Sequence, residues 1–153
     1  MEEHERRLLL IADKLDVVAT MPPARFNFAC WVGHDWKGLP DLSCGTSACA
    51  LGHASTIPEL QALGLRLIVD SSGSGHVCVF GKEGNFDDDL KNVADLFGLT
   101  RKEFDFLFIP FSHQGDSALE EQENVYGRIG PGLNATAKEV ADHIRAFVQH
   151  KYH

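Results

Sequence analysis

The stretch LRLIVDSSGSGHVCVFG, residues 65–81, is the feature that most constrains the fold. Two runs rich in β-branched and aromatic residues flank the link SSGSG, which contains two glycines. Short runs of this type, joined by a glycine-containing link, are typical of a β-hairpin, whose strands are antiparallel. The sequence therefore predicts an antiparallel sheet instead of the βαβ units on which nucleotide-binding folds are built.

Helical periodicity dominates the rest of the chain. Apolar residues recur three or four positions apart in several segments, which places them on one face of a helix. This spacing predicts helices at residues 3–19, 44–54 and 56–64, a helical hairpin over 86–109, and a last helix that starts at 136. Together with the hairpin, these helices indicate a single α+β domain, mostly helical, with a small antiparallel sheet.

Two of the predicted helix starts carry a local signature. Thr100 with Glu103, and Thr136 with Glu139, have the spacing of a capping box. In this motif each side chain accepts a hydrogen bond from the backbone N–H of the other residue. The signature predicts where both helices begin.

Three segments show neither the pattern of a long helix nor that of the hairpin. Residues 26–31 alternate in polarity and predict a short strand. Residues 33–43 and 110–134 contain glycine, proline and many polar residues, and we expect them to be loops. Loops as long as 110–134 are usually functional or mobile, so this segment is a candidate contact surface.

Length, composition and charge bound the class of protein. The 153 residues, 44% of them hydrophobic, suffice for one domain with a sizeable core. The first residues lack the pattern of a secretory signal, and no run of about 18 apolar residues occurs, so we expect a cytoplasmic location and no membrane partner. The net charge of −8 disfavours nucleic acid and anionic lipid as partners.

The stretch CGTSACALGHA, residues 44–54, combines two cysteines, one histidine and several small residues. Close packing is the preferred interpretation, because small side chains let elements approach and a thiol behaves as a small buried hydrophobe. Zinc binding is an alternative: Cys49 and His53 lie four residues apart, and Cys44 and His34 would complete a tetrahedral set. The paired short spacings typical of structural zinc sites are absent from the sequence.

Cys44 is also a candidate nucleophile. It precedes a predicted helix start, where backbone N–H groups stabilise a thiolate, and His76 is available as a base. The stretch SGSGHVCVFG resembles the histidine strand of papain-like thiol amidases. This resemblance implies an acyl-transfer hydrolase in which Cys44 attacks, His76 transfers the proton, and Asn85 or Asp87 orients the imidazole.

Three blocks of the sequence resemble an uncharacterised family of small bacterial and phage proteins. The blocks are CGTSACALGHA, VADLFGLTRKEFDFLF and NATAKEVADHIRAF. They contain a cysteine–glycine–threonine helix start, a helical pair that ends in Leu-Phe, and a closing amphipathic helix. The resemblance implies an architecture and no particular activity.

The stretch WVGHDWKG is a candidate binding loop. It places Trp31, His34 and Trp36 close together, and such side chains on a loop line small-molecule pockets or protein contacts. The alternative is that both tryptophans cover the edge of the core.

Two further clusters of ionisable residues have simpler interpretations. The acids at 87–89 begin a predicted helix, where the helix dipole favours negative charge. His143, His150 and His153 lie near the C-terminal end of the last predicted helix, and we expect them to form a solvated tail.

The preferred hypothesis is a non-enzymatic module that binds another protein or a small molecule, with no cofactor and no metal. A second copy of the chain is a further candidate partner. Two alternatives stay open: a thiol hydrolase that uses Cys44 and His76, and a zinc-binding domain that uses Cys44, Cys49 and His53.

Overall fold

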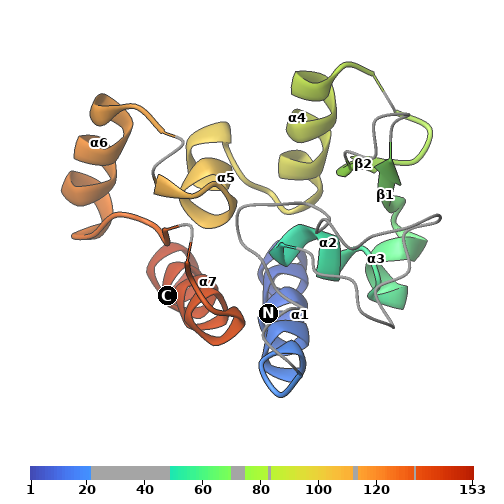
Figure 1. Cartoon of the computed structure of the whole chain (residues 1–153), viewed down its shortest axis with the longest axis horizontal. Helices are drawn as coiled ribbons and strands as arrows, with labels where there is room; N and C mark the ends of the chain where they lie inside the picture. The colour runs from blue at the N-terminus through green and yellow to red at the C-terminus, as the bar shows by residue number, and fades with distance from the viewer. Residues whose placement is uncertain (22–48, 70–74, 83, 112–113, 133) are drawn as a thin grey trace.

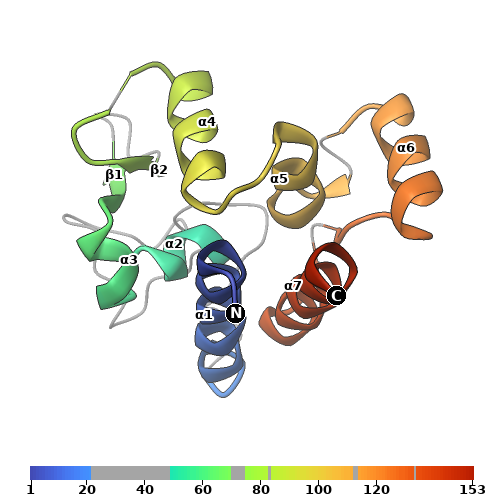
Figure 2. The same ribbon diagram turned by 180° about the vertical axis from the view of Figure 1, so that it is seen from behind.

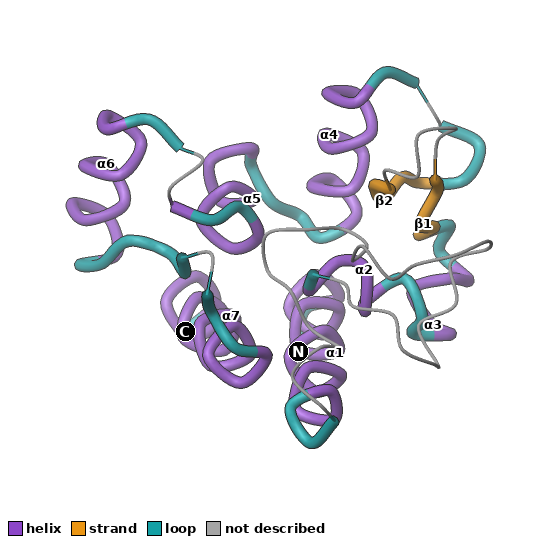
Figure 3. The backbone as a smooth tube through the Cα atoms, viewed as in Figure 1, coloured by secondary structure: helices purple, strands orange, loops and turns teal. Residues whose placement is uncertain are grey.

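The computed structural model describes residues 1–21, 49–69, 75–82, 84–111, 114–132 and 134–153. Within these ranges the chain forms seven helices and a two-stranded sheet (Figures 1 and 3). The elements are α1 (Glu3–Val18), α2 (Ala50–Ala54), α3 (Pro58–Ala62), β1 (Leu65–Val69), β2 (Gly75–Val79), α4 (Phe86–Leu96), α5 (Arg101–Phe108), α6 (Asp116–Tyr126) and α7 (Ala137–Tyr152). This is the mostly helical α+β domain that the sequence predicts.

The predicted hairpin is confirmed. Strands β1 and β2 are antiparallel, with Leu65 opposite Val79 and Leu67 opposite Val77. Alternate side chains of a strand share a face, and these four are all buried. Helix α4 packs along β2, so the hairpin and α4 form one end of the molecule (Figure 1).

Helices α1 and α7 form the main part of the core and lie side by side (Figures 1 and 2). They run antiparallel, since His153 contacts Glu5 at one end and Arg145 contacts Asp16 towards the other. Their facing stripes are buried and consist of Leu8, Ile11, Ala12, Leu15 and Val18 in α1, and of Ala137, Val140, Ala141, Ile144, Phe147 and Val148 in α7. Helical spacing of apolar residues in the sequence therefore produced the expected buried faces.

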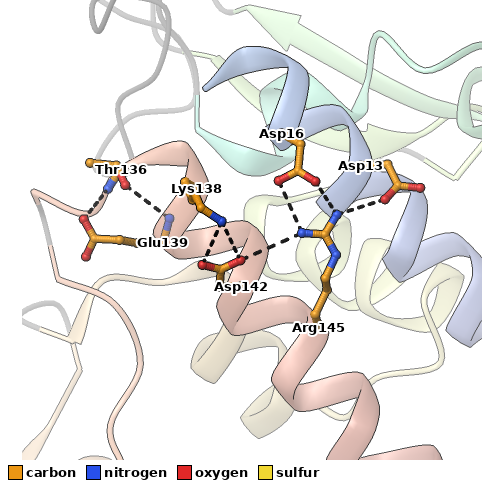
Figure 4. A network of polar contacts seen from close by, with 7 residues as sticks. All are labelled: Asp13, Asp16, Thr136, Lys138, Glu139, Asp142 and Arg145. Atoms are coloured by element: carbon orange, nitrogen blue, oxygen red, sulfur yellow. Dashed lines mark hydrogen bonds and ion pairs between the residues drawn. The ribbon is translucent and has the colours of Figure 1, made fainter. Parts of the chain in front are cut away.

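Charged side chains flank this apolar contact (Figure 4). Two guanidinium nitrogens of Arg145 donate to the two carboxylate oxygens of Asp16 at 3.2 and 2.5 Å, and one of them also donates to Asp13 at 2.9 Å. The hydrogen bond from Arg145 is the main reason why the pKa of Asp16 is lowered. The same view shows the capping box of Thr136 and Glu139, which confirms the predicted start of α7.

The turn between α4 and α5 depends on both a capping box and a glycine. Thr100 and Glu103 form the predicted capping box at the start of α5. Gly98 has φ +66°, and a Cβ at this position would overlap the ring of His4. Lys151 of α7 donates to the Gly98 carbonyl oxygen at 3.0 Å, so the turn is held between the two ends of the chain.

The prediction of a loop over residues 110–134 is wrong. Residues Asp116–Tyr126 form helix α6, which starts after Gly115 and ends at Gly127, a residue with φ +73°. Only Gln122 of this helix is buried, and polar residues interrupt its apolar positions, so the sequence lacks a continuous apolar stripe that would indicate a helix. Helix α6 lies at one end of the longest axis of the molecule, far from the hairpin (Figures 1 and 2).

The helix predicted at 44–54 is confirmed in its second half. Helix α2 begins at Ala50, and Cys49 is its N-cap residue. All five residues of α2 are buried, and the helix packs against α1. The predicted strand at 26–31 and the predicted loop at 33–43 lie outside the residues that the structure describes.

In the part of the chain that the structure describes, no helix combines the length and the apolar character needed to cross a membrane.

Candidate functional site

An open cleft lies between α5 and α6. Its volume is about 510 Å³, which falls within the range of roughly 300–1,000 Å³ found for ligand sites. One stripe of α6 lines the cleft: Ser117, Ala118, Glu121, Gln122, Val125 and Tyr126. The opposite wall includes Lys102, Glu103 and Asp105 of α5.

The composition of the α6 stripe explains why the cleft is open. Its members are three or four residues apart, so they share the face that is turned to α5. Two helices interlock closely when such a stripe carries large apolar side chains. Here Glu121 and Gln122 occupy the middle of the stripe, and Val125 is 50% exposed. The stripe therefore lacks the side chains that would close the contact.

A relay of amide groups holds α6 in place instead. The Gln114 Nε2 group donates to the carbonyl oxygens of Asp105 and Ile109, at 3.0 and 2.8 Å, and thus caps the end of α5. The Gln114 Oε1 atom accepts from Gln122 Nε2 at 2.6 Å, and Gln122 Oε1 accepts from the backbone N–H of Gly130 at 3.1 Å. Gln122 is only 6% exposed, and Gly130 is buried as well. Removal of the Gln122 side chain would therefore leave a buried N–H group without its acceptor.

Tyr126 forms the aromatic part of the cleft wall. Its ring stacks on Phe106 of α5, with centroids 4.0 Å apart and planes 10° from parallel. Burial raises the pKa of Tyr126, and the negative charges of Glu103 and Glu121 raise it further. Both carboxylates thus lie close enough to Tyr126 to disfavour the negatively charged form of its side chain.

One ion pair spans the cleft. The Lys102 ammonium of α5 lies 3.0 Å from a carboxylate oxygen of Glu121 on α6. The two side chains are 78% and 48% exposed, and pairs this exposed contribute at most about 1 kcal/mol. The pair can therefore open at little cost, which would expose the Glu121 carboxylate to a ligand.

His143 of α7 lies beneath the same region and corrects one expectation. It is 7% exposed, so it does not belong to a solvated tail. Its Nε2–H donates to the Phe106 carbonyl oxygen at 3.0 Å, and its ring meets the Phe106 ring edge-on. The pKa of His143 is lowered to about 4, mainly by burial, and the positive charge of Arg128 lowers it further.

Gly130 completes this contact. A Cβ at this position would overlap the Phe106 carbonyl oxygen, so the backbone can approach α5 only because residue 130 is glycine. The N–H of the same residue is the last member of the amide relay. Gly130 therefore links the buried His143 contact to the wall of the cleft.

Most of the residues that the sequence singled out lie outside the described part of the chain. This holds for Trp31, His34, Trp36 and Cys44. The structure describes the backbone of His76, which pairs with Ile68 in the hairpin. The binding loop and the Cys44–His76 hydrolase therefore stay predictions.

The remaining zinc candidates are both buried. Cys49 is 6% exposed and His53 2% exposed, and the N–H of His53 donates to the Cys49 carbonyl oxygen within the first turn of α2. Among the residues with described positions, no three His, Cys, Asp or Glu side chains are grouped to hold a metal ion. The zinc hypothesis depends on Cys44, outside that set, and stays a prediction.

Sequence reasoning missed the α5–α6 cleft. A weak signal was present, because Ala118, Gln122 and Val125 have helical spacing and Gly127 follows as a helix terminator. The polar centre of the stripe obscured it.

Comparison of the chain with protein-family models, with curated proteins and with solved structures finds no match in any of the three. The function must therefore be inferred from the geometry of the chain itself.

Proposed function

We propose that this protein is a non-enzymatic, cytoplasmic binding module whose α5–α6 cleft receives part of a partner molecule. One observation carries the proposal: α5 and α6 meet at the Tyr126–Phe106 stack and leave an open cleft of about 510 Å³ beside it. A gap of this size next to a well-packed core leaves apolar and polar groups available to a ligand.

The walls of the cleft support a role in recognition. Val125, Ala118 and the Tyr126 ring offer apolar surface, while Lys102 and Glu121 offer charges. Binding sites commonly combine an apolar lining with a few placed polar groups of this kind. The mixture suits a ligand that has both an apolar and a charged part.

The floor of the cleft supports the same role. The relay through Gln114 and Gln122 joins α5, α6 and Gly130, and its amide groups are mutually hydrogen-bonded. A satisfied buried network fixes the positions of the surrounding groups. A ligand would thus meet a preorganised surface, which lowers the entropic cost of binding.

A fragment screen tests the proposed site. The uniformly ¹⁵N-labelled full chain is exposed to a library of small organic fragments, and amide chemical shifts are recorded. We expect the shifts caused by binders to concentrate on residues 100–106 and 114–126. Ala118→Trp fills the cleft and should abolish these shifts.

Ala62→Trp is the matched control, because Ala62 is an exposed alanine on the distant helix α3. This variant should bind the same fragments as the unmodified chain. The proposed function would be contradicted if the shift changes of all binders lay away from the α5–α6 cleft. It would also be contradicted if the fragments still bound the Ala118→Trp variant.

A further inference from the structure

The charge on the cleft walls is unbalanced. Among the residues that the structure describes, Glu103, Asp105 and Glu121 line the cleft, against a single lining cation, Lys102. Two of these carboxylates have other partners, since Glu103 binds Lys151 and Asp105 binds Arg101. Glu121 has only the exposed Lys102 as its partner among the residues with described positions. It is therefore the carboxylate that a ligand reaches most easily.

The far side of α6 is acidic as well. The helix contains Asp116, Glu120, Glu121 and Glu123 and no lysine or arginine. Asp116, Glu120 and Glu123 are spaced four and three residues apart, so they form a stripe on the face that is turned away from the cleft. This stripe cannot touch a ligand in the cleft, but its field attracts cations to α6 and raises their association rate.

The apolar surface lies next to Glu121 on the same helix. Val125 is one turn further along α6 and is 50% exposed, and Tyr126 follows it. A ligand held at Glu121 by a positive group would place its next apolar group against these two residues. The geometry thus selects for a cation with an adjoining apolar part.

We propose that the occupant of the cleft is a basic peptide segment of a protein partner, in which an arginine or lysine replaces Lys102 at Glu121 and a neighbouring apolar side chain covers Val125 and Tyr126. The inference rests on the proposed function and names its partner class. A peptide is favoured over a free amine because the cleft is open and α6, with 11 residues, extends over about 16 Å. A small ligand would stay largely solvated in such a groove, whereas a peptide covers its length.

Competition for Glu121 makes the proposal testable. If the ligand takes the place of Lys102, removal of Lys102 strengthens binding, although it removes a contact from the folded protein. A role of the Lys102–Glu121 pair in holding α6 alone would predict unchanged or weaker binding. The two explanations therefore differ in sign.

The probe is a fluorescein-labelled 12-residue peptide of lysine, arginine and leucine in which leucines recur every three or four residues. Its affinity for the full chain is measured by fluorescence anisotropy, and the site is mapped by ¹⁵N chemical shifts. We expect Glu121→Gln to weaken binding about tenfold, the loss expected for one charge-assisted hydrogen bond. Lys102→Ala should tighten it about threefold to tenfold.

Helix α4 offers matched controls, because Lys91 and Asp95 form an exposed ion pair of the same type. Lys91→Ala and Asp95→Asn make the same changes in net charge at a distant site. We expect each to change the affinity less than twofold. Equal effects at the two sites would mean that the net negative charge of the chain alone attracts the peptide, and this would overturn the proposal.

Two further probes separate the partner class from the site. A peptide with glutamate in place of every lysine and arginine should not bind, and N-acetyl-arginine amide should bind at least tenfold more weakly than the basic peptide. If the acidic peptide or the free arginine derivative binds the cleft as well as the basic peptide, the partner class is wrong while the cleft remains a site. If neither the fragments nor any of the peptides changes the amide chemical shifts of the cleft residues, both the partner class and the proposed function are wrong.

Discussion

The α1–α7 pair and the α5–α6 pair solve the same packing problem in different ways. In α1 and α7, two continuous apolar stripes are buried against each other, and charged residues such as Arg145 and Asp16 remain at the edge. In α5 and α6, the polar residues Glu121 and Gln122 occupy the centre of the stripe, and a cleft remains. The difference shows that the closely packed apolar contact and the open cleft lie in separate parts of one domain.

The contrast has a simple physical origin. Apolar side chains gain free energy by excluding water from their shared surface, so they draw helices together. Amide side chains gain only when every donor and acceptor finds a partner, and this fixes a distance without filling the space around it. The Gln114–Gln122 contact thus positions α6 and leaves room beside it.

The largest expected effect tests the first half of this comparison. Ile144 of α7 is completely buried, and Ile144→Ala should lower the free energy of unfolding by about 2–5 kcal/mol because it leaves a cavity. Val125 of α6 is half exposed, and Val125→Ala should change the free energy of unfolding by no more than about 0.5 kcal/mol. Urea denaturation of both variants measures the difference. Similar values for the two would show that α6 is packed as tightly as α7.

The second prediction concerns pH and the contact between α7 and α5. The pKa of His143 is about 4 in the folded chain, against roughly 6.5 when the chain is unfolded. Between these values the unfolded chain binds a proton that the folded chain excludes, so stability falls as the pH decreases from 6.5 to 4. The loss at pH 4 amounts to about 3 kcal/mol.

His143→Gln provides the check, since glutamine has a side-chain donor and does not titrate. We expect this variant to lack the part of the decline that lies between pH 6.5 and 4.5 in pH-dependent urea denaturation. Glu3, Glu5 and Asp16 also have lowered pKa values, but the ordinary values of these groups, 4.5 for glutamate and 3.8 for aspartate, place their effect at lower pH. An unchanged slope above pH 4.5 in the variant would mean that His143 is not the group responsible.

The third prediction tests the amide relay. Gln122→Ala leaves the buried N–H of Gly130 without its acceptor and should lower the free energy of unfolding by about 1–3 kcal/mol. Gln149→Ala is a control with the same change at an exposed glutamine of α7. In hydrogen exchange, Gln122→Ala should lose protection at Gly130 first. Protection that stays intact there would show that the relay does not hold this segment.

The smallest effects distinguish the two ion pairs. Arg145→Gln breaks the contacts with Asp16 and Asp13 and should cost about 1 kcal/mol, because the pair has several hydrogen bonds at the edge of the core. Lys102→Gln at the cleft should cost at most about 0.5 kcal/mol, since its pair is more exposed. Thermal unfolding in low and high salt compares them. A larger loss for Lys102→Gln would identify its pair as a structural clamp of α6.

The sequence predicted the elements whose signals are local. The hairpin, the helical pair α4–α5 and both capping boxes depend on residues close together in the chain, and the structure confirms each of them. Helix α6 escaped prediction because polar residues occupy the centre of its stripe, and such an interrupted pattern resembles that of a loop. His143 was expected in solvent because the sequence gives no sign that Gly130 and Phe106 would cover it.

For the described residues other than α6, the sequence by itself determined which segments become helix or strand, because the period of apolar residues and the caps act within a few residues. Only the tertiary structure decided that α6 stands off from α5 and that a cleft lies between them. That spacing depends on contacts between distant residues, such as the stacking of Tyr126 on Phe106 and the bond from Gly130 to Gln122. Such contacts form only when the whole chain is folded, so no local pattern in the sequence specifies them.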